Sequence, residues 1–212
     1  MHRVVPSILI FAFVFTATAV FAQEDFSGDI VTAKESGNQN RTKIYVTKDK
    51  WRIEGLQEGR MGGAIITNLV TRTSDILMPE RKMYMEFPQG QGPAGQRLMN
   101  FYHARDIDNA CSDWLKLPYN QGGTCHKVGP ETVNGRSTVK YEGTNGKGES
   151  GAVWFDKKIA FPIKWEGQKG GSGELQNIKE GAQPASLFEI PSDYQKFQMP
   201  AGMPNPPNMP NR

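Results

Sequence analysis

Cysteine and histidine are the residue types in this sequence with the most distinctive chemistry. Cys111 and Cys125 are the only cysteines, His126 adjoins Cys125, and His103 lies upstream of both. Two cysteines and two histidines at these spacings match no zinc-binding pattern, so a metal site or a free nucleophile is the weaker interpretation. In an oxidising compartment we expect a disulfide, which closes a loop of about 15 residues and stabilises the fold by roughly 3 kcal/mol in the chain-entropy account.

Other catalytic arrangements are scarce. Neither Ser150 nor Ser172 lies in a complete G-x-S-x-G elbow, so a hydrolase lacks visible machinery. His103 and Asp106 are one helical turn apart, which could orient an imidazole but is more typical of a surface pair. The glycine-rich run 90–95 follows a predicted strand, as a dinucleotide-binding fingerprint does, but the surrounding strands are hairpins rather than a parallel βαβ unit. We therefore expect no enzymatic activity, cofactor or metal.

The N-terminus has the features of a secretory signal peptide. Arg3 supplies a basic start, residues 8–15 form an apolar run, and small residues lead to Ala22. A membrane anchor is the alternative, but this run is shorter than the ~20 residues that a spanning helix needs. No cysteine near Ala22 offers a site for lipid attachment. We expect cleavage of residues 1–22, which leaves a periplasmic or secreted protein that is soluble and has no integral membrane segment.

The charge distribution argues against a nucleic-acid partner. The formal net charge is +3 at pH 7, and loss of Arg3 with the signal peptide lowers it further. Lys and Arg are interleaved with Asp and Glu instead of forming the basic stripe that attracts a polyanion. The length fits one domain, which we place at residues 23–196. Residues 197–212 are rich in Met and Pro, so we expect an extended tail, with a recruitment motif as the alternative.

Short alternating runs bounded by Gly, Asn, Asp or Pro indicate β-strands through most of the chain. Residues 47–50 and 78–81 resemble hairpin turns, and Asn134-Gly135 favours a two-residue hairpin. Strands joined so closely must run antiparallel. The sequence predicts about eleven strands, at residues 26–33, 42–47, 51–56, 64–69, 75–78, 83–87, 127–133, 138–143, 151–155, 160–167 and 173–178.

Helical spacing occurs in one place, between the predicted strands 83–87 and 127–133. Residues 96–108 place Leu98, Phe101 and Tyr102 near helical spacing, which predicts one amphipathic helix. The segment between the two cysteines carries Trp114, and we expect the bridge to pin an apolar loop or helical turn beside this helix. Residues 184–188 form a further short element.

The alternation of the strands predicts one large apolar face that the helix covers incompletely. Its unusual feature is methionine at three positions around the 78–83 turn, because β-branched residues define a sheet surface better, whereas methionine adapts to irregular guests. Charged neighbours such as Lys43 and Arg52 mark the opposite face. Val139 and Tyr141 are also assigned inward. The candidate ligand-binding residues, which in the simpler interpretation only pack on one another, are Ile44, Val46, Trp51, Ile53, Ile76, Met78, Met83, Met85, Phe87, Leu98, Phe101, Tyr102, Val153, Phe155, Ile163 and Trp165.

The order of these features resembles the LolA/LolB-like superfamily of periplasmic lipoprotein carriers and their secreted relatives. The likeness covers most of the chain after the signal peptide and rests on loose motifs, at residues 43–46, 51–54, 76–87, 154–156, 161–164 and 187–191. The resemblance implies a mainly β fold with a helical lid, in which a strongly curved antiparallel sheet forms an incomplete barrel around an apolar cavity for acyl chains. The chain departs from the lipoprotein chaperones in its shorter predicted lid and its disulfide, and no residue matches their functional positions.

Two functions follow from this interpretation. The first is a noncatalytic carrier or sensor of lipid-like or acylated-protein ligands, held reversibly in an apolar cavity. The second is a protein-interaction module that uses a sheet edge or groove without lipid cargo. The sequence specifies neither the ligand nor the oligomeric state.

Overall fold

The computed structural model describes residues 24–33, 39–55, 63–88, 106–117, 120–167 and 171–197. The predicted signal peptide, nearly all of the predicted tail, and Leu98, Phe101 and Tyr102 of the predicted helix lie outside these ranges. No helix among the described residues is long and apolar enough to cross a membrane.

A single twelve-stranded sheet makes up the fold, in the order β12-β6-β5-β4-β3-β2-β1-β11-β10-β9-β8-β7. Neighbouring strands pair antiparallel, except that β12 runs parallel to β6. All eleven predicted strands are present, and β12 is the one that the sequence did not indicate. The strands are β1 (Phe26–Ala33), β2 (Gln39–Val46), β3 (Lys50–Glu54), β4 (Ala64–Asn68), β5 (Thr73–Met78), β6 (Met83–Pro88), β7 (Thr124–Val133), β8 (Arg136–Thr144), β9 (Ser150–Asp156), β10 (Pro162–Gly167), β11 (Gly171–Glu180) and β12 (Gln195–Lys196).

The order follows from two runs of hairpins joined through one long-range pair. Strands β1 to β6 pair in sequence order, as do β7 to β11, and β1 pairs with β11 to unite the two runs. The predicted Asn134-Gly135 turn is confirmed, since both residues have positive φ and Val133 pairs with Arg136. Positive φ at both central positions is the geometry that matches strand twist in a two-residue hairpin.

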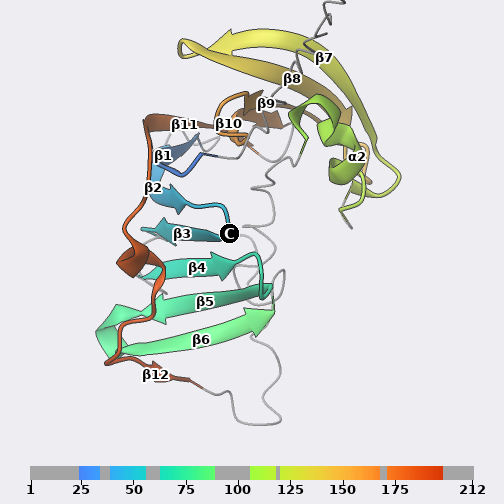
Figure 1. The fold of residues 1–212 in the computed structure, drawn as a ribbon. Coiled ribbons are helices and arrows are strands. Elements are labelled where there is room, and N and C mark those ends of the chain that lie inside the picture. The colour runs from blue at the N-terminus through green and yellow to red at the C-terminus, as the bar shows by residue number, and fades with distance from the viewer. Residues whose placement is uncertain are drawn as a thin grey trace, which may run out of the picture.

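Strong curvature bends this sheet, so that β7 to β9 arch over the inner side of the bend, and β12 and β7 remain unjoined at its two ends (Figure 1). Irregular pairing interrupts β1 opposite β11 and β10 opposite β9, and such bulges increase local bending. Two glycines allow close approach at the bend: a Cβ on Gly28 would lie 2.9 Å from Leu175, and one on Gly173 would lie 2.2 Å from the Trp165 ring. The predicted incomplete barrel is therefore confirmed.

A short helix, α2 (Ala110–Trp114), lies on the inner side of the bend (Figure 1). The predicted disulfide between Cys111 and Cys125 is present and ties α2 to β7. Ala110 packs against Tyr141 and Phe155, which identifies the face carrying these two residues as the concave one.

The helix predicted at 96–108 is described only from Asp106 onward. There Ile107–Asn109 forms a 3-10 turn, η2, rather than α-helix, and the side chain of Asp106 caps it by accepting from the Asp108 N–H. The helical turn expected inside the disulfide loop is α2.

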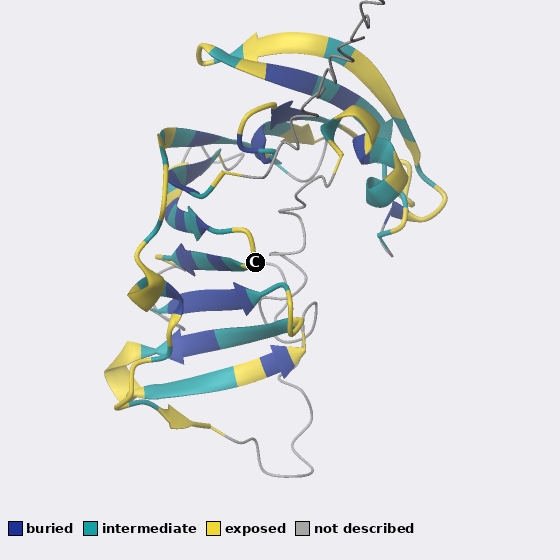
Figure 2. Ribbon diagram, in the orientation of Figure 1, coloured by how far each residue is buried: buried dark blue, intermediate teal, exposed yellow. Residues whose placement is uncertain are grey.

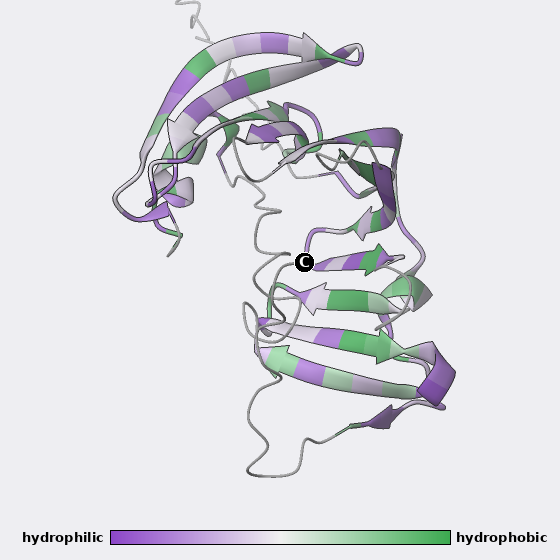
Figure 3. Cartoon of the chain, turned by 180° about the vertical axis from the view of Figure 1, so that it is seen from behind, coloured by the Kyte–Doolittle hydropathy of each residue, from purple (hydrophilic) through white to green (hydrophobic). Residues whose placement is uncertain are grey.

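The C-terminal segment covers the convex face of β3 to β6. Phe188, from the 3-10 turn η4 (Ala185–Phe188), is buried against Ile66 and Leu77, and Figure 3 shows the apolar stretches of β4 and β5 beside it. The Arg52 guanidinium donates to the Leu187 carbonyl at 2.8 Å. As a result β4 is buried on both faces (Figure 2), which explains its unbroken apolar run.

One carboxylate oxygen on this convex face is buried without a hydrogen bond. Within the described residues, Asp75 Oδ1 is buried without a partner, and Asp75 pairs across the sheet with Glu86. Burial, and then the negative charge of Glu86, raise the pKa of Asp75 above its ordinary value of 3.8. The Asp75 carboxyl therefore keeps its proton to a higher pH in the folded protein than in the unfolded chain. As pH rises above 3.8, ionisation of Asp75 favours the unfolded chain, and the free energy of unfolding falls.

Replacing Asp75 with asparagine should raise the free energy of unfolding at pH 7 by about 1 kcal/mol, because the change removes a desolvated charge. The gain should shrink as pH falls toward 4. Urea denaturation at several pH values measures it. Asp193→Asn is the matched control, since Lys82 lies 3.0 Å away and lowers the pKa of Asp193, so this change should bring no gain. Equal effects of the two changes would contradict the assignment.

Candidate functional site

Strand pairing places the described candidate residues on the concave face, and Ile163, at the irregular β9–β10 register, joins them through the central cluster. Ile44 pairs with Ile53, Ile53 with Ile65, Ile65 with Ile76, and Ile76 with Met85, which forms an apolar ladder across five strands. Residues paired across antiparallel strands point to the same side of a sheet, so the predicted alternation is correct over β2 to β6.

The second half of the sheet continues the same face. Trp165 pairs with Val153, and Val153 with Tyr141, while Gly173 connects Trp165 to β11. The Trp165 indole lies over Gly173, as the close approach of a hypothetical Cβ shows. The two hairpin runs therefore present one apolar concave surface, with α2 at the β8–β9 end.

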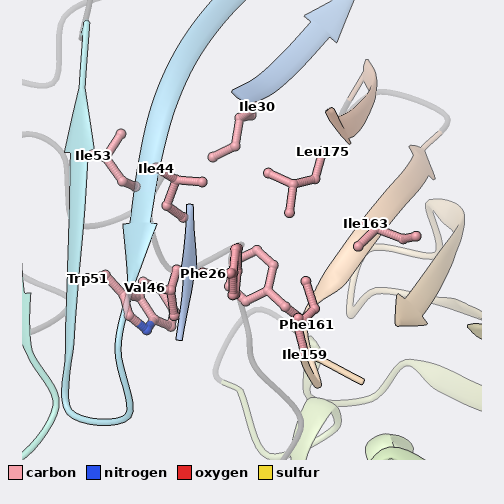
Figure 4. Packing of buried hydrophobic residues seen from close by; sticks show 10 residues of the cluster. All are labelled: Phe26, Ile30, Ile44, Val46, Trp51, Ile53, Ile159, Phe161, Ile163 and Leu175. Atoms are coloured by element: carbon pink, nitrogen blue, oxygen red, sulfur yellow. The ribbon is translucent and has the colours of Figure 1, made fainter. Parts of the chain in front are cut away.

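Side chains of the protein itself fill the middle of this surface. Figure 4 shows this central cluster, in which the ring centroids of Phe161 lie 5.2 Å from Phe26 and 6.0 Å from Trp51. Ile159 and Phe161 come from the β9–β10 turn and are fully buried. The central cluster consists of Phe26, Ile30, Ile44, Val46, Trp51, Ile53, Ile159, Phe161, Ile163 and Leu175.

A buried carboxylate holds that turn in place. Asp156 is 1% exposed, and its Oδ1 accepts from the backbone N–H groups of Lys158 and Ile159 at 2.8 and 3.0 Å. Arg136 bridges Asp156 and Glu180, and Lys158 also contacts Glu180. The hydrogen bond from Lys158, followed by that from Arg136, lowers the pKa of Glu180. These ion pairs fix the turn that carries Phe161 into the bend.

The predicted strand 160–167 begins two residues too early, and its assignment concealed that Phe161 belongs to this turn. The strand begins at Pro162, and Ala160 has a φ of 51°, which ends extended structure before it. The Asp156 side chain followed by Lys157-Lys158 was the available signal, since an aspartate that accepts from N–H groups two and three residues later is typical of a turn.

Burial divides the candidate residues into two groups. Ile44, Val46, Trp51, Ile53, Ile76, Phe87, Phe155 and Ile163 are buried. The remaining described candidates are half-buried, and the methionines among them gather at the β5–β6 end, where Met78 pairs with Met83 and Met85 packs beside Phe87. This methionine end, defined as Met78, Met83 and Met85, is a half-buried apolar part of the concave face.

No charged side chain occupies a described concave position of β2 to β6. Lys43, Arg52 and Glu86 all lie on the convex side, as predicted. Nor does any group of three or more His, Cys, Asp or Glu in the described ranges come close enough to hold a metal. The described concave positions are Asn40, Thr42, Ile44, Val46, Trp51, Ile53, Ile65, Thr67, Ser74, Ile76, Met78, Met83, Met85 and Phe87.

No protein-family model matches the chain, and no curated protein does. Among solved structures it is similar to an uncharacterized conserved protein from Thermus thermophilus, with a TM-score of 0.51 and 11% identity over 82% of this chain and 90% of that one. Identity at this level shows a shared fold alone.

Two further solved structures are more weakly similar. One is the MucA/MucB complex of Pseudomonas aeruginosa, with a TM-score of 0.47 and 17% identity over 78% of this chain and 55% of that one. The other is the LolA superfamily protein NE2245 of Nitrosomonas europaea, with a TM-score of 0.33 and 12% identity over 80% of this chain and 91% of that one. Scores below 0.5 do not establish a shared fold by themselves. The incomplete barrel of this chain is established by its own single curved and unclosed sheet.

Replacing Phe161 with alanine should lower the free energy of unfolding by about 3–5 kcal/mol, because it empties the middle of the central cluster. Phe197→Ala removes the same atoms from a side chain that is 38% exposed, and it should cost less, about 1–2 kcal/mol. Urea denaturation followed by circular dichroism compares the two. Similar losses would show that Phe161 does not fill the bend.

Proposed function

We propose that this protein is a noncatalytic binding protein or carrier for ligands with acyl chains, either lipids or acylated proteins, and that it works in the periplasm or outside the cell after cleavage near Ala22. The binding domain is residues 23–196, followed by the tail 197–212. The ligand lies on the concave face at the methionine end.

The observation that carries this proposal is the half-buried methionine end on an apolar, uncharged face. Met78, Met83 and Met85 border Ile76 and Phe87 without being buried themselves. Methionine side chains are flexible and polarizable, and they can repack around guests of irregular shape. A core that packs only on itself gains more from β-branched residues, whose rotamers are better defined.

The packed middle of the sheet limits where a chain can lie. Ile44, Val46 and Ile163 contact other side chains of the central cluster, so their role is to hold the curvature. Each methylene that leaves water contributes roughly 0.8 kcal/mol, from which ordering costs must be subtracted. A ligand held over a partly open surface would thus bind reversibly, as a carrier requires.

The alternative of a protein-binding sheet edge has less support. Among the described residues β7 is an edge strand, but its pairing is irregular between Lys127 and Gly129, and Pro130 follows. Bulges and prolines on an edge discourage the addition of another strand.

Lipid that co-purifies with the protein tests the proposal. Organic extraction of purified protein, followed by mass spectrometry, should detect acyl-containing molecules, and native mass spectrometry should show the corresponding mass. Met83→Asp and Met85→Asp should abolish this signal while leaving secretion intact, because a charge desolvated by an acyl chain is costly.

Val70→Asp is the matched control, since it adds the same charge at a residue that is 71% exposed in the β4–β5 turn. It should retain the lipid. Equal amounts of co-purifying lipid in all variants would mean that lipid binds away from the methionine end. A wild-type protein without lipid would favour the protein-interaction module.

A further inference from the structure

The concave face contains a hydrogen-bond donor without an acceptor. Trp51 is 8% exposed, and within the described residues its indole Nε1–H is buried with no hydrogen-bond partner. Figure 4 places this nitrogen on the ring edge that is turned away from Ile44 and Ile53. Tryptophan N–H groups usually find a partner when buried, so this one is a place where a ligand atom would be favoured.

A second donor lies on the neighbouring strand, on the same face. Thr67, itself 8% exposed, is the direct cross-strand neighbour of Trp51, and its hydroxyl lies 3.0 Å from that of Ser74 on the following strand. Each hydroxyl carries one hydrogen, and one hydrogen is enough for the bond between them. The other remains for an outside acceptor. Thr67 and Trp51 are directly opposed, so their Cβ atoms lie about 5 Å apart on the concave face.

The surroundings restrict the charge of that group. Both donors require an acceptor, and no cation stands on any described concave position of β2 to β6 to balance an anion. A carboxylate or phosphate would therefore be desolvated without a counter-charge, whereas a carbonyl would only exchange hydrogen bonds.

We propose that the Trp51 N–H and the Thr67–Ser74 hydroxyl pair bind the neutral carbonyl oxygen of an ester-linked acyl chain. This inference rests on the proposed function and adds the class of ligand: acyl esters, rather than free fatty acids or purely hydrocarbon guests. The acyl chain would run from Trp51 toward the methionine end, which lies on the same face two to three strands away from β3.

A matched pair of neutral ligands tests the inference. Monopalmitoylglycerol carries the ester carbonyl, and the corresponding hexadecylglycerol ether lacks it. Dissociation constants are measured at equilibrium by displacement of the fluorescent probe N-phenyl-1-naphthylamine, with palmitate as the charged comparison. The wild-type protein should bind the ester about tenfold more tightly than the ether, the usual effect of satisfying a buried donor, and palmitate more weakly than the ester.

Trp51→Phe keeps an aromatic ring but removes the N–H, and Thr67→Val removes the hydroxyl at nearly constant volume. Each should reduce the preference for the ester while leaving ether binding within about threefold, a margin of under 1 kcal/mol. Trp154→Phe is the matched control. It makes the same tryptophan-to-phenylalanine change on the convex side, where the Trp154 Nε1–H donates to Glu131 at 2.6 Å, and it should keep the full preference for the ester over the ether. Circular dichroism checks that each variant is folded.

Equal binding of ester and ether by the wild type, or a preference that survives in both folded variants, would overturn the inference and leave the carrier function standing. Tighter binding of palmitate would overturn the requirement for a neutral group. Absence of binding by all three ligands would instead overturn the proposed function together with this inference.

Discussion

The packing of Phe161 and Ile159 into the bend of the sheet is the contact on which the rest of the structure depends. Both side chains are fully buried, and they hold β10 and β11 against β1 to β3 from the concave side. The buried Asp156 fixes the turn that carries them, through two backbone N–H groups and Arg136. Burying an unpaired carboxylate is costly, so Asp156 needs these partners in the interior. The partners in turn hold the turn that fills the bend, so the network and the curvature stabilise each other.

The curvature separates two faces with different chemistry. Around β2 to β6 the described concave positions are apolar or uncharged, while the convex face carries Lys43, Arg52 and Glu86 and is partly covered by the C-terminal segment. The C-terminal segment buries the convex side of β4, whereas the three methionines on the concave side stay half-buried. The proposed ligand site therefore depends on β2 to β6, in the first half of the described chain, and on the C-terminal segment that covers their convex side.

Of the three buried side-chain atoms without a hydrogen bond in the described residues, two belong to this half of the sheet, one on each face, and the third is Asn120 Oδ1. Asp75 Oδ1 is a desolvated acceptor beside Glu86, and Trp51 Nε1 is a desolvated donor beside Thr67. The acceptor belongs to a carboxyl whose pKa is raised, so it acts on stability through pH. The Trp51 Nε1–H belongs to the uncharged concave face, where a ligand carbonyl would accept its hydrogen bond.

The sequence by itself determined the strands, their hairpins, the disulfide and the concave face, because alternation, Asn134-Gly135 and paired cysteines are local signals or need only one partner. Only the tertiary structure decided that the β9–β10 turn fills the bend, that β12 pairs parallel to β6, and that Trp51 Nε1 and Asp75 Oδ1 are unpaired. Each of these depends on which residues distant in sequence meet at a given point. Periodicity tells which side of a strand a residue faces, but not what comes to cover it.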